Sequence, residues 1–133
     1  MPIKPSSAKA KGRLLQNWTC QKIADLLALP WGKDEVIASR EMGQSGTDVR
    51  LIGEAKERFP FSVECKSQEA WSVPAWIAQA KANQGDGTDW LLVMKKNRMP
   101  PVVVMDAEAF FTLLRKLQHG TPDEHRDPEL PES

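Results

Sequence analysis

Apolar residues recur at helical spacing in the first part of the chain and alternate with polar residues in its middle. Residues 8–29 predict an amphipathic helix that Pro30 and Gly32 end. The residues expected to face the core from this helix are Leu14, Leu15, Trp18, Ile23, Leu26 and Leu27. Within residues 61–66, Phe61, Val63 and Cys65 alternate with Ser62, Glu64 and Lys66. This two-residue period is typical of a half-buried strand.

The other segments complete an alternating order of helices and strands. Further strands are predicted at residues 36–40, 47–51, 90–94 and 102–105, and helices at 73–83 and 107–117, with a connector or short helical turn at 53–58. The last helix is expected to bury Phe110, Phe111 and Leu114. The resulting order, α-β-β-β-α-β-β-α, favours an α/β fold with a central mixed β-sheet of about five strands flanked by helices.

Composition favours one domain between two polar ends. The chain has 133 residues, of which 41% are hydrophobic, and this suits a single modest core. We expect a flexible arm at residues 1–7, the folded domain at 8–118 and an acidic, Pro-rich, disordered tail at 119–133. The tail holds five acidic residues, so the rest of the chain has 17 basic and 13 acidic residues despite a net charge of zero. A positively charged body is compatible with binding to a polyanion.

Several classes of protein are disfavoured by absent signals. Two cysteines are too few for a disulfide scaffold. No apolar run has the form of a signal peptide or the length of a bilayer span, so we expect a cytoplasmic protein with no membrane partner. No Walker loop is present, and no nucleotide cofactor is expected. His119 and His125 have no convincing partner for a histidine-based metal nuclease.

Candidate chemistry lies in Asp48 and in the triplet Glu64-Cys65-Lys66. Alternation places Glu64 and Lys66 on one face of their strand, and Asp48 can lie near Glu64 if the two strands pair as antiparallel neighbours. Two carboxylates and the backbone carbonyl of Cys65 would suffice for Mg²⁺, which keeps several waters. Lys66 could then orient or deprotonate a water, or neutralise charge on phosphate oxygens. The alternative is an ordinary exposed charge pair on a strand.

This order of elements, together with Asp48 and Glu64-x-Lys66, resembles the PD-(D/E)XK nuclease superfamily. The chain is most similar to the Holliday junction resolvases of archaea and their bacteriophage-encoded relatives. The other matching segments are Lys11-Gly12-Arg13, Ser39-Arg40, Ser45-Gly46-Thr47, the helix with Trp76, Gln79, Ala80 and Asn83, and the turn Lys95-Lys96-Asn97-Arg98. The resemblance spans residues 8–117. It implies a homodimeric, Mg²⁺-dependent endonuclease, with Mn²⁺ as a substitute, that acts on branched double-stranded DNA.

The chain departs from this family pattern at two positions. The first element of the family is usually Pro-Asp or Gly-x-Asp, and Gly46-Thr47-Asp48 keeps its carboxylate and lacks only the proline. Gln16 stands where the archaeal members place a metal-associated glutamate on the first helix. Gln16 can hydrogen-bond a metal-bound water but carries no charge, so one-metal and two-metal sites both remain open. Ser45 is a candidate for positioning the attacked strand, with a structural role in the turn as its alternative.

Basic residues supply the candidate DNA contacts. Lys9, Lys11 and Arg13 are expected to bind phosphates, unless they only keep the chain soluble. The turn residues Lys95, Lys96 and Arg98 are candidates for gripping a second DNA arm, and a merely solvated turn is the alternative. Arg40 either binds the scissile phosphate or pairs with Glu41.

Two other functions remain beside junction resolution. One is a nuclease of another specificity, such as a nicking, fork or restriction-type enzyme. The other is a non-catalytic DNA-binding module on this fold.

Overall fold

The computed structural model describes residues 5–41 and 46–119, and of Pro5 and Ser6 it describes the backbone alone. Its elements are α1 (Pro5–Leu27), β1 (Ile37–Ser39), β2 (Val49–Leu51), α2 (Gly53–Arg58), β3 (Phe61–Ser67), α3 (Val73–Ala82), β4 (Asp89–Lys95), β5 (Val102–Met105) and α4 (Ala107–His119). The predicted α/β class and the predicted order of elements are confirmed, with residues 53–58 forming a short helix. The predicted acidic tail lies outside the described residues, apart from His119.

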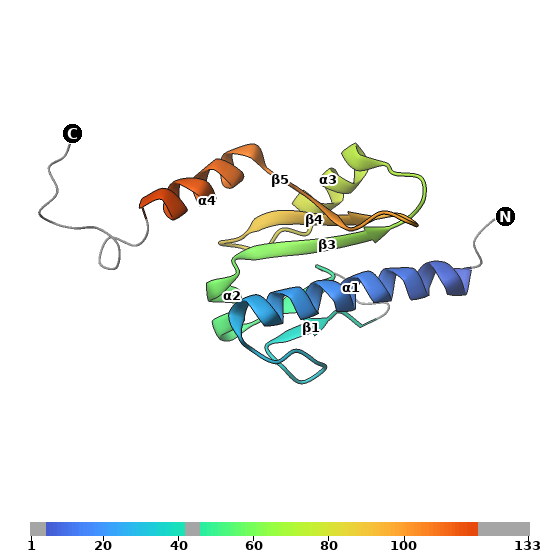
Figure 1. Cartoon of the computed structure of the whole chain (residues 1–133), viewed down its shortest axis with the longest axis horizontal. Coiled ribbons are helices and arrows are strands. Elements are labelled where there is room, and N and C mark those ends of the chain that lie inside the picture. Colours follow the sequence, from blue (N-terminus) through green and yellow to red (C-terminus); the bar gives the residue numbers. More distant parts are fainter. Residues whose placement is uncertain (1–4, 42–45, 120–133) are drawn as a thin grey trace, which may run out of the picture.

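The strands are divided between two sheets (Figure 1). In the larger sheet, β4 is central, parallel to β3 and antiparallel to β5. The smaller sheet is the antiparallel pair of β1 and β2, in which Ala38 lies opposite Arg50. The prediction of a single central sheet was therefore inaccurate in this respect. A backbone hydrogen bond connects the residue before β2 to the larger sheet. The N–H of Asp48 donates to the carbonyl of Val63 in β3 over 2.9 Å.

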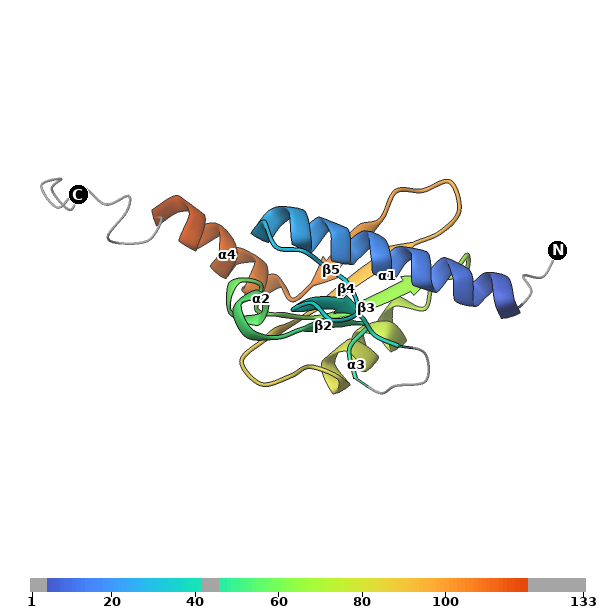
Figure 2. The same ribbon diagram turned by 90° about the horizontal axis from the view of Figure 1, so that it is seen from below.

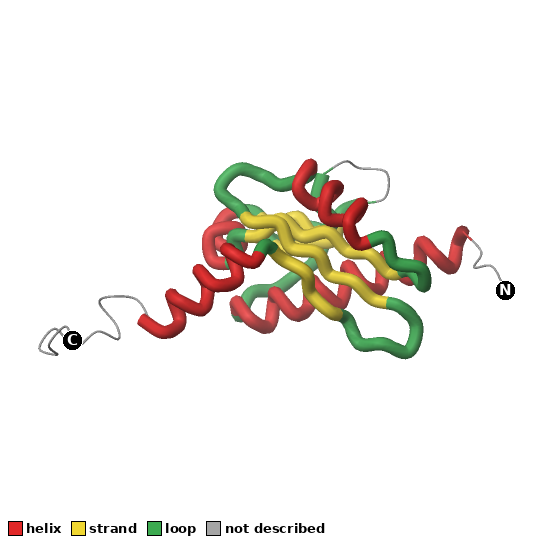
Figure 3. Tube along the Cα trace, turned by 90° about the horizontal axis from the view of Figure 1, so that it is seen from above, coloured by secondary structure: helices red, strands yellow, loops and turns green. Residues whose placement is uncertain are grey.

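Helices cover both faces of the larger sheet (Figures 2 and 3). On one face, α1 packs its buried residues against Val63, Cys65, Leu91 and Val93. On the other face, Trp76 and Ala80 of α3 pack against Trp90, Leu92 and Met94. As a result β3 is buried on both faces from Ser62 to Cys65, whereas its alternating pattern predicted burial on one face only.

The buried face of α1 differs from the predicted one. Leu15, Ile23 and Leu27 are buried as expected, but Leu14, Trp18 and Leu26 are 67%, 42% and 68% exposed. Since successive helical residues point about 100° apart, Leu14 and Leu15 cannot both face the core fully. The polar Thr19 and the small residues Cys20 and Ala24 complete the buried face instead.

The last helix, α4, extends away from the sheet (Figures 1 and 2). None of its residues is buried, so the prediction that Phe110, Phe111 and Leu114 enter the core is wrong. The faces of the larger sheet are already occupied by α1 and α3, and α4 lies beside neither. No helix in the described part of the chain is both long enough and apolar enough to cross a membrane.

Candidate active site

Asp48 lies immediately before β2 and is held against β3. Its carboxylate accepts a 2.7 Å hydrogen bond from the backbone N–H of Cys65. It also forms an ion pair with the Arg40 guanidinium, with 2.8 Å between nitrogen and oxygen. Its side chain is almost inaccessible to solvent. β2 and β3 belong to different sheets, so the antiparallel pairing that was the condition for bringing Asp48 near Glu64 is not formed. The contacts made by the backbone and carboxylate of Asp48 nevertheless bring it to the middle of β3.

Glu64 is buried in the centre of β3, with 2% of its surface exposed. Its Oε1 accepts a 2.8 Å hydrogen bond from the side-chain amide of Asn83, the residue that follows α3. Desolvation raises the pKa of Glu64 to about 7; the bond from Asn83 opposes the rise, and the negative charge of Asp48 adds to it. Asp48 is hydrogen-bonded to the backbone N–H of Cys65, the residue after Glu64, so the two carboxylates belong to one site.

The residues on either side in the triplet have distinct surroundings. Lys66 lies on the same face of β3 as Glu64, and its charge lowers the pKa of Glu64 slightly. Cys65 points the other way, toward α1, where its sulfur lies 3.6 Å from the hydroxyl of Thr19. Burial raises the pKa of the Cys65 thiol far above its ordinary value, so this thiol is unsuited to binding a metal as thiolate.

The donors at this site fit a hard divalent cation. Within residues 5–41 and 46–119, no group of three or more His, Cys, Asp or Glu side chains could hold a metal ion. The protein ligands of a metal at this site would therefore be two carboxylates and a backbone carbonyl. The N–H of Cys65 faces Asp48, and in a regular strand the carbonyl of the same residue faces the same edge. This donor set suits Mg²⁺, which binds oxygen and keeps several waters.

Arg40 pairs with Asp48 and not with Glu41, the partner that the sequence analysis had considered. One guanidinium nitrogen lies 2.8 Å from Asp48 Oδ1, and the other donates to the carbonyl of Gly46 over 2.8 Å. The Arg40 side chain remains 28% exposed. Arg40 therefore links the buried carboxylate to the surface. Ser45, the other candidate in this turn, lies outside the described residues.

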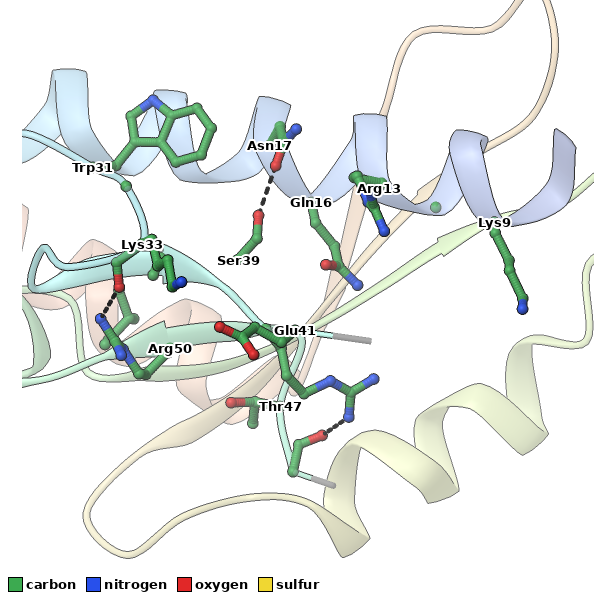
Figure 4. A pocket seen from close by; sticks show the side chains of 16 residues that line it. Lys9, Arg13, Gln16, Asn17, Trp31, Lys33, Ser39, Glu41, Thr47 and Arg50 are labelled. Atoms are coloured by element: carbon green, nitrogen blue, oxygen red, sulfur yellow. Dashed lines mark hydrogen bonds between the residues drawn. The ribbon is translucent and has the colours of Figure 1, made fainter. Parts of the chain in front are cut away.

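A cleft of about 870 Å³ opens between α1 and the β1–β2 pair (Figure 4). Lys9, Arg13 and Gln16 project into it from α1, at spacings of four and three residues that share a helical face. Arg40, Lys33 and Arg50 line it from the other side. Gln16 thus lines the same cleft as Arg40, while the described contacts of Asp48 and Glu64 do not include it.

Lys11 belongs to a different part of the surface from Lys9 and Arg13. Its ammonium donates to the side-chain carbonyl of Asn97 over 2.9 Å. It therefore lies beside the turn between β4 and β5, which carries Lys95, Lys96 and Arg98. In this turn the Lys96 ammonium lies 5.2 Å from the centre of the Trp71 ring. The candidate DNA contacts therefore lie in two regions, the cleft and this turn, and Lys11 lies at the turn although it was grouped with Lys9 and Arg13 in the sequence.

Three residues near the candidate site were not predicted to be part of it. Asn83 was noted only as part of the matching helix, and its bond to Glu64 depends on how α3 packs on β3. Lys33 and Arg50 line the cleft, but their neighbours in sequence give no sign of it. Arg50 is fixed there by hydrogen bonds to the carbonyls of Lys33 and Glu35. These placements follow from the tertiary fold and have no signal in local sequence.

Comparison with known proteins gives one family. A family model described as "Phage putative PDDEXK endonuclease" matches residues 9–126. No protein of curated function and no solved structure matches the chain significantly. The family match covers most of the chain, including all but the first four residues of α1, both buried carboxylates and α4.

Proposed function

Because this chain belongs to the family of phage PD-(D/E)XK endonucleases, we propose that it is a metal-dependent enzyme that cleaves branched DNA and resolves four-way (Holliday) junctions. The observation that carries the proposal is the buried pair of Asp48 and Glu64, with Lys66 on the same face of β3 as Glu64. Burying two carboxylates side by side is costly unless a cation joins them. Such an arrangement is typical of a functional site.

Each residue of the site has a separate role in this proposal. Asp48, Glu64 and the carbonyl of Cys65 would hold Mg²⁺ or Mn²⁺, and Asn83 fixes the orientation of Glu64. When bound there, the cation supplies an activated water and neutralises charge on the attacked phosphate. Lys66 orients that water or stabilises the phosphate oxygens. Gln16 replaces a charged ligand by a neutral one, which favours one firmly held metal over two.

Arg40 changes partner when DNA and cation bind. In the described state its guanidinium neutralises Asp48. With a divalent cation held at Asp48, this ion pair would no longer be needed, and the partly exposed guanidinium would be free to hold the scissile phosphate beside the site. The same residue would thus stabilise the empty site and bind substrate in the occupied one.

The two basic regions provide surfaces for two DNA segments. Lys9 and Arg13 project into the cleft beside Arg40, while Lys11, Lys95, Lys96 and Arg98 lie around the β4–β5 turn. Cations on separate surfaces can neutralise the backbones of two arms. This division favours a branched substrate over a single linear duplex. A homodimer would present two such sites to the symmetric strands of a four-way junction.

Cleavage assays on matched substrates test this function. The wild-type protein is expected to cut a mobile four-way junction on opposing strands with Mg²⁺ or Mn²⁺, and to cut flaps and linear duplex of equal length more slowly. Asp48→Asn should lose cleavage and keep junction binding. Lys66→Ala should lower turnover more than it lowers affinity.

Other outcomes favour the alternatives. Preferential cutting of flaps, forks or linear duplex would make the protein a nuclease of another specificity. Junction binding without cleavage in both the wild type and Asp48→Asn, with either metal, would make it a non-catalytic DNA-binding module.

A further inference from the structure

Helix α4 carries an apolar face that the described part of the chain leaves uncovered. Phe110, Leu113, Leu114 and Leu117 recur at intervals of three and four residues, and Phe111 extends the same face. All five side chains are between 38% and 77% exposed. Glu108, Thr112 and Arg115 occupy the opposite face. The helix is therefore strongly amphipathic, and within residues 5–41 and 46–119 no apolar core cluster includes its side chains.

The local sequence is that of a well-formed helix. The Asp106 carboxylate caps its first turn by accepting a 3.0 Å hydrogen bond from the N–H of Ala109. Glu108 lies in the first turn, and Lys116 and His119 lie in the last turn, each where the helix dipole favours its charge. An isolated helix of 13 residues is still only marginally stable in water. Its apolar face must pack against something for the helix to persist.

We infer that this face binds the same face of α4 in a second copy of the chain. A face that pairs with itself about a two-fold axis needs no further complementary surface. Together the five residues expose roughly 500 Å², so two copies would bury up to about 1,000 Å², the area that a weak biological interface has to reach.

The chain itself offers a poor alternative occupant. Residues 120–133 contain Leu130 as their one large aliphatic residue and no aromatic residue. Such a segment cannot cover two phenylalanines and three leucines. The self-association rests on the proposed function only in giving the proposed homodimer its surface, and it can be measured without DNA or metal.

Sedimentation equilibrium of the full chain over a wide concentration range tests the inference. The wild type is expected to dimerise, and Leu114→Glu to weaken dimerisation by about tenfold or more, since it places a charge in the middle of the interface. Leu26→Glu, on the exposed face of α1, is the matched control and should dimerise like the wild type. Because both positions are exposed, both variants should keep the far-ultraviolet circular dichroism of the wild type.

A crosslinking experiment tests the position directly. Under mild oxidation, Leu114→Cys should form a disulfide-linked dimer, whereas Thr112→Cys on the polar face should not; Cys20 and Cys65 are buried. A wild type that stays monomeric, a Leu114→Glu variant that dimerises normally, or equal crosslinking of both cysteine variants would overturn the inference. Loss of junction cleavage alone would bear on the proposed function and leave this inference standing.

Discussion

At the scale of the residue, Glu64 couples the candidate site to folding. Its pKa is about 7 in the folded chain against an ordinary 4.5, chiefly because it is buried. Between these two values the folded state holds a proton that the unfolded state has released. The protonated Glu64 carboxyl therefore stabilises the folded state fully below the pKa of the unfolded chain, and this contribution is lost as the pH rises through the pKa of the folded chain. The loss is at most about 3 kcal/mol.

The change Glu64→Gln should remove this pH dependence from the metal-free protein. Glutamine keeps an oxygen that can accept the bond from Asn83 and cannot ionise. We expect the variant to be more stable than the wild type at about pH 8, and the difference to shrink toward about pH 5. Urea unfolding in the presence of a chelator measures this. A constant difference across the range would show that Glu64 does not titrate in this way.

Adding Mg²⁺ at about pH 8 should reverse that order of stability. A cation held by Asp48 and Glu64 binds the folded state alone, so it should raise the unfolding free energy of the wild type. Glu64→Gln lacks one of the charged ligands and should gain much less. The measurement is the same urea titration with and without Mg²⁺. Equal stabilisation of both proteins would contradict Glu64 as a ligand.

Local sequence could indicate which residues carry the chemistry but not their partners. The alternation in residues 61–66 indicated that Glu64 and Lys66 share a face, since that depends only on the geometry of a strand. The ion pair of Arg40 with Asp48 and the bond from Asn83 to Glu64 depend on which loop and which helix end reach β3. No periodicity encodes such long-range placement. The roles of these residues stay predictions.

At the scale of the element, α1 illustrates that adjacent apolar residues of a helix can have opposite environments. Leu14 and Leu15 are adjacent leucines with opposite environments, 67% and 2% exposed. Leu15→Ala should cost about 2–4 kcal/mol of unfolding free energy, since it leaves a cavity against β3. Leu14→Ala removes the same atoms and should change stability by less than about 0.5 kcal/mol. Chemical denaturation of both variants tests this, and equal losses would contradict the assigned face.

The sequence predicted the elements better than their packing. The helical spacing and strand alternation gave the order of elements and the α/β class, because each pattern is local. Three exposed residues of α1 and the apolar residues of α4 were assigned to the core. Apolar spacing indicates that a helix has a hydrophobic face, but it does not indicate what packs against that face. The division into two sheets arises from the short β1 and β2, which pair with each other.

At the scale of the whole molecule, charge is separated into regions that the net value conceals. The overall charge is zero, yet the cleft is lined by five basic side chains and one acidic residue, Glu41. A field of one sign focused in a cleft attracts a polyanion regardless of net charge. Affinity for DNA should therefore depend steeply on salt, through the particular cations that touch phosphate.

Replacing both Lys9 and Arg13 by alanine should weaken that salt dependence. If each cation of the cleft contacts one phosphate, the slope of log affinity against log salt should fall by about 2, on an Asp48→Asn background that prevents cleavage. Lys22→Ala is the control, because this lysine lies 5.5 Å from the centre of the Trp18 ring on the exposed face of α1. Fluorescence anisotropy of a labelled junction at several salt concentrations measures both slopes. An equal change per charge removed in Lys22→Ala would show that overall charge, and not the cleft, governs binding.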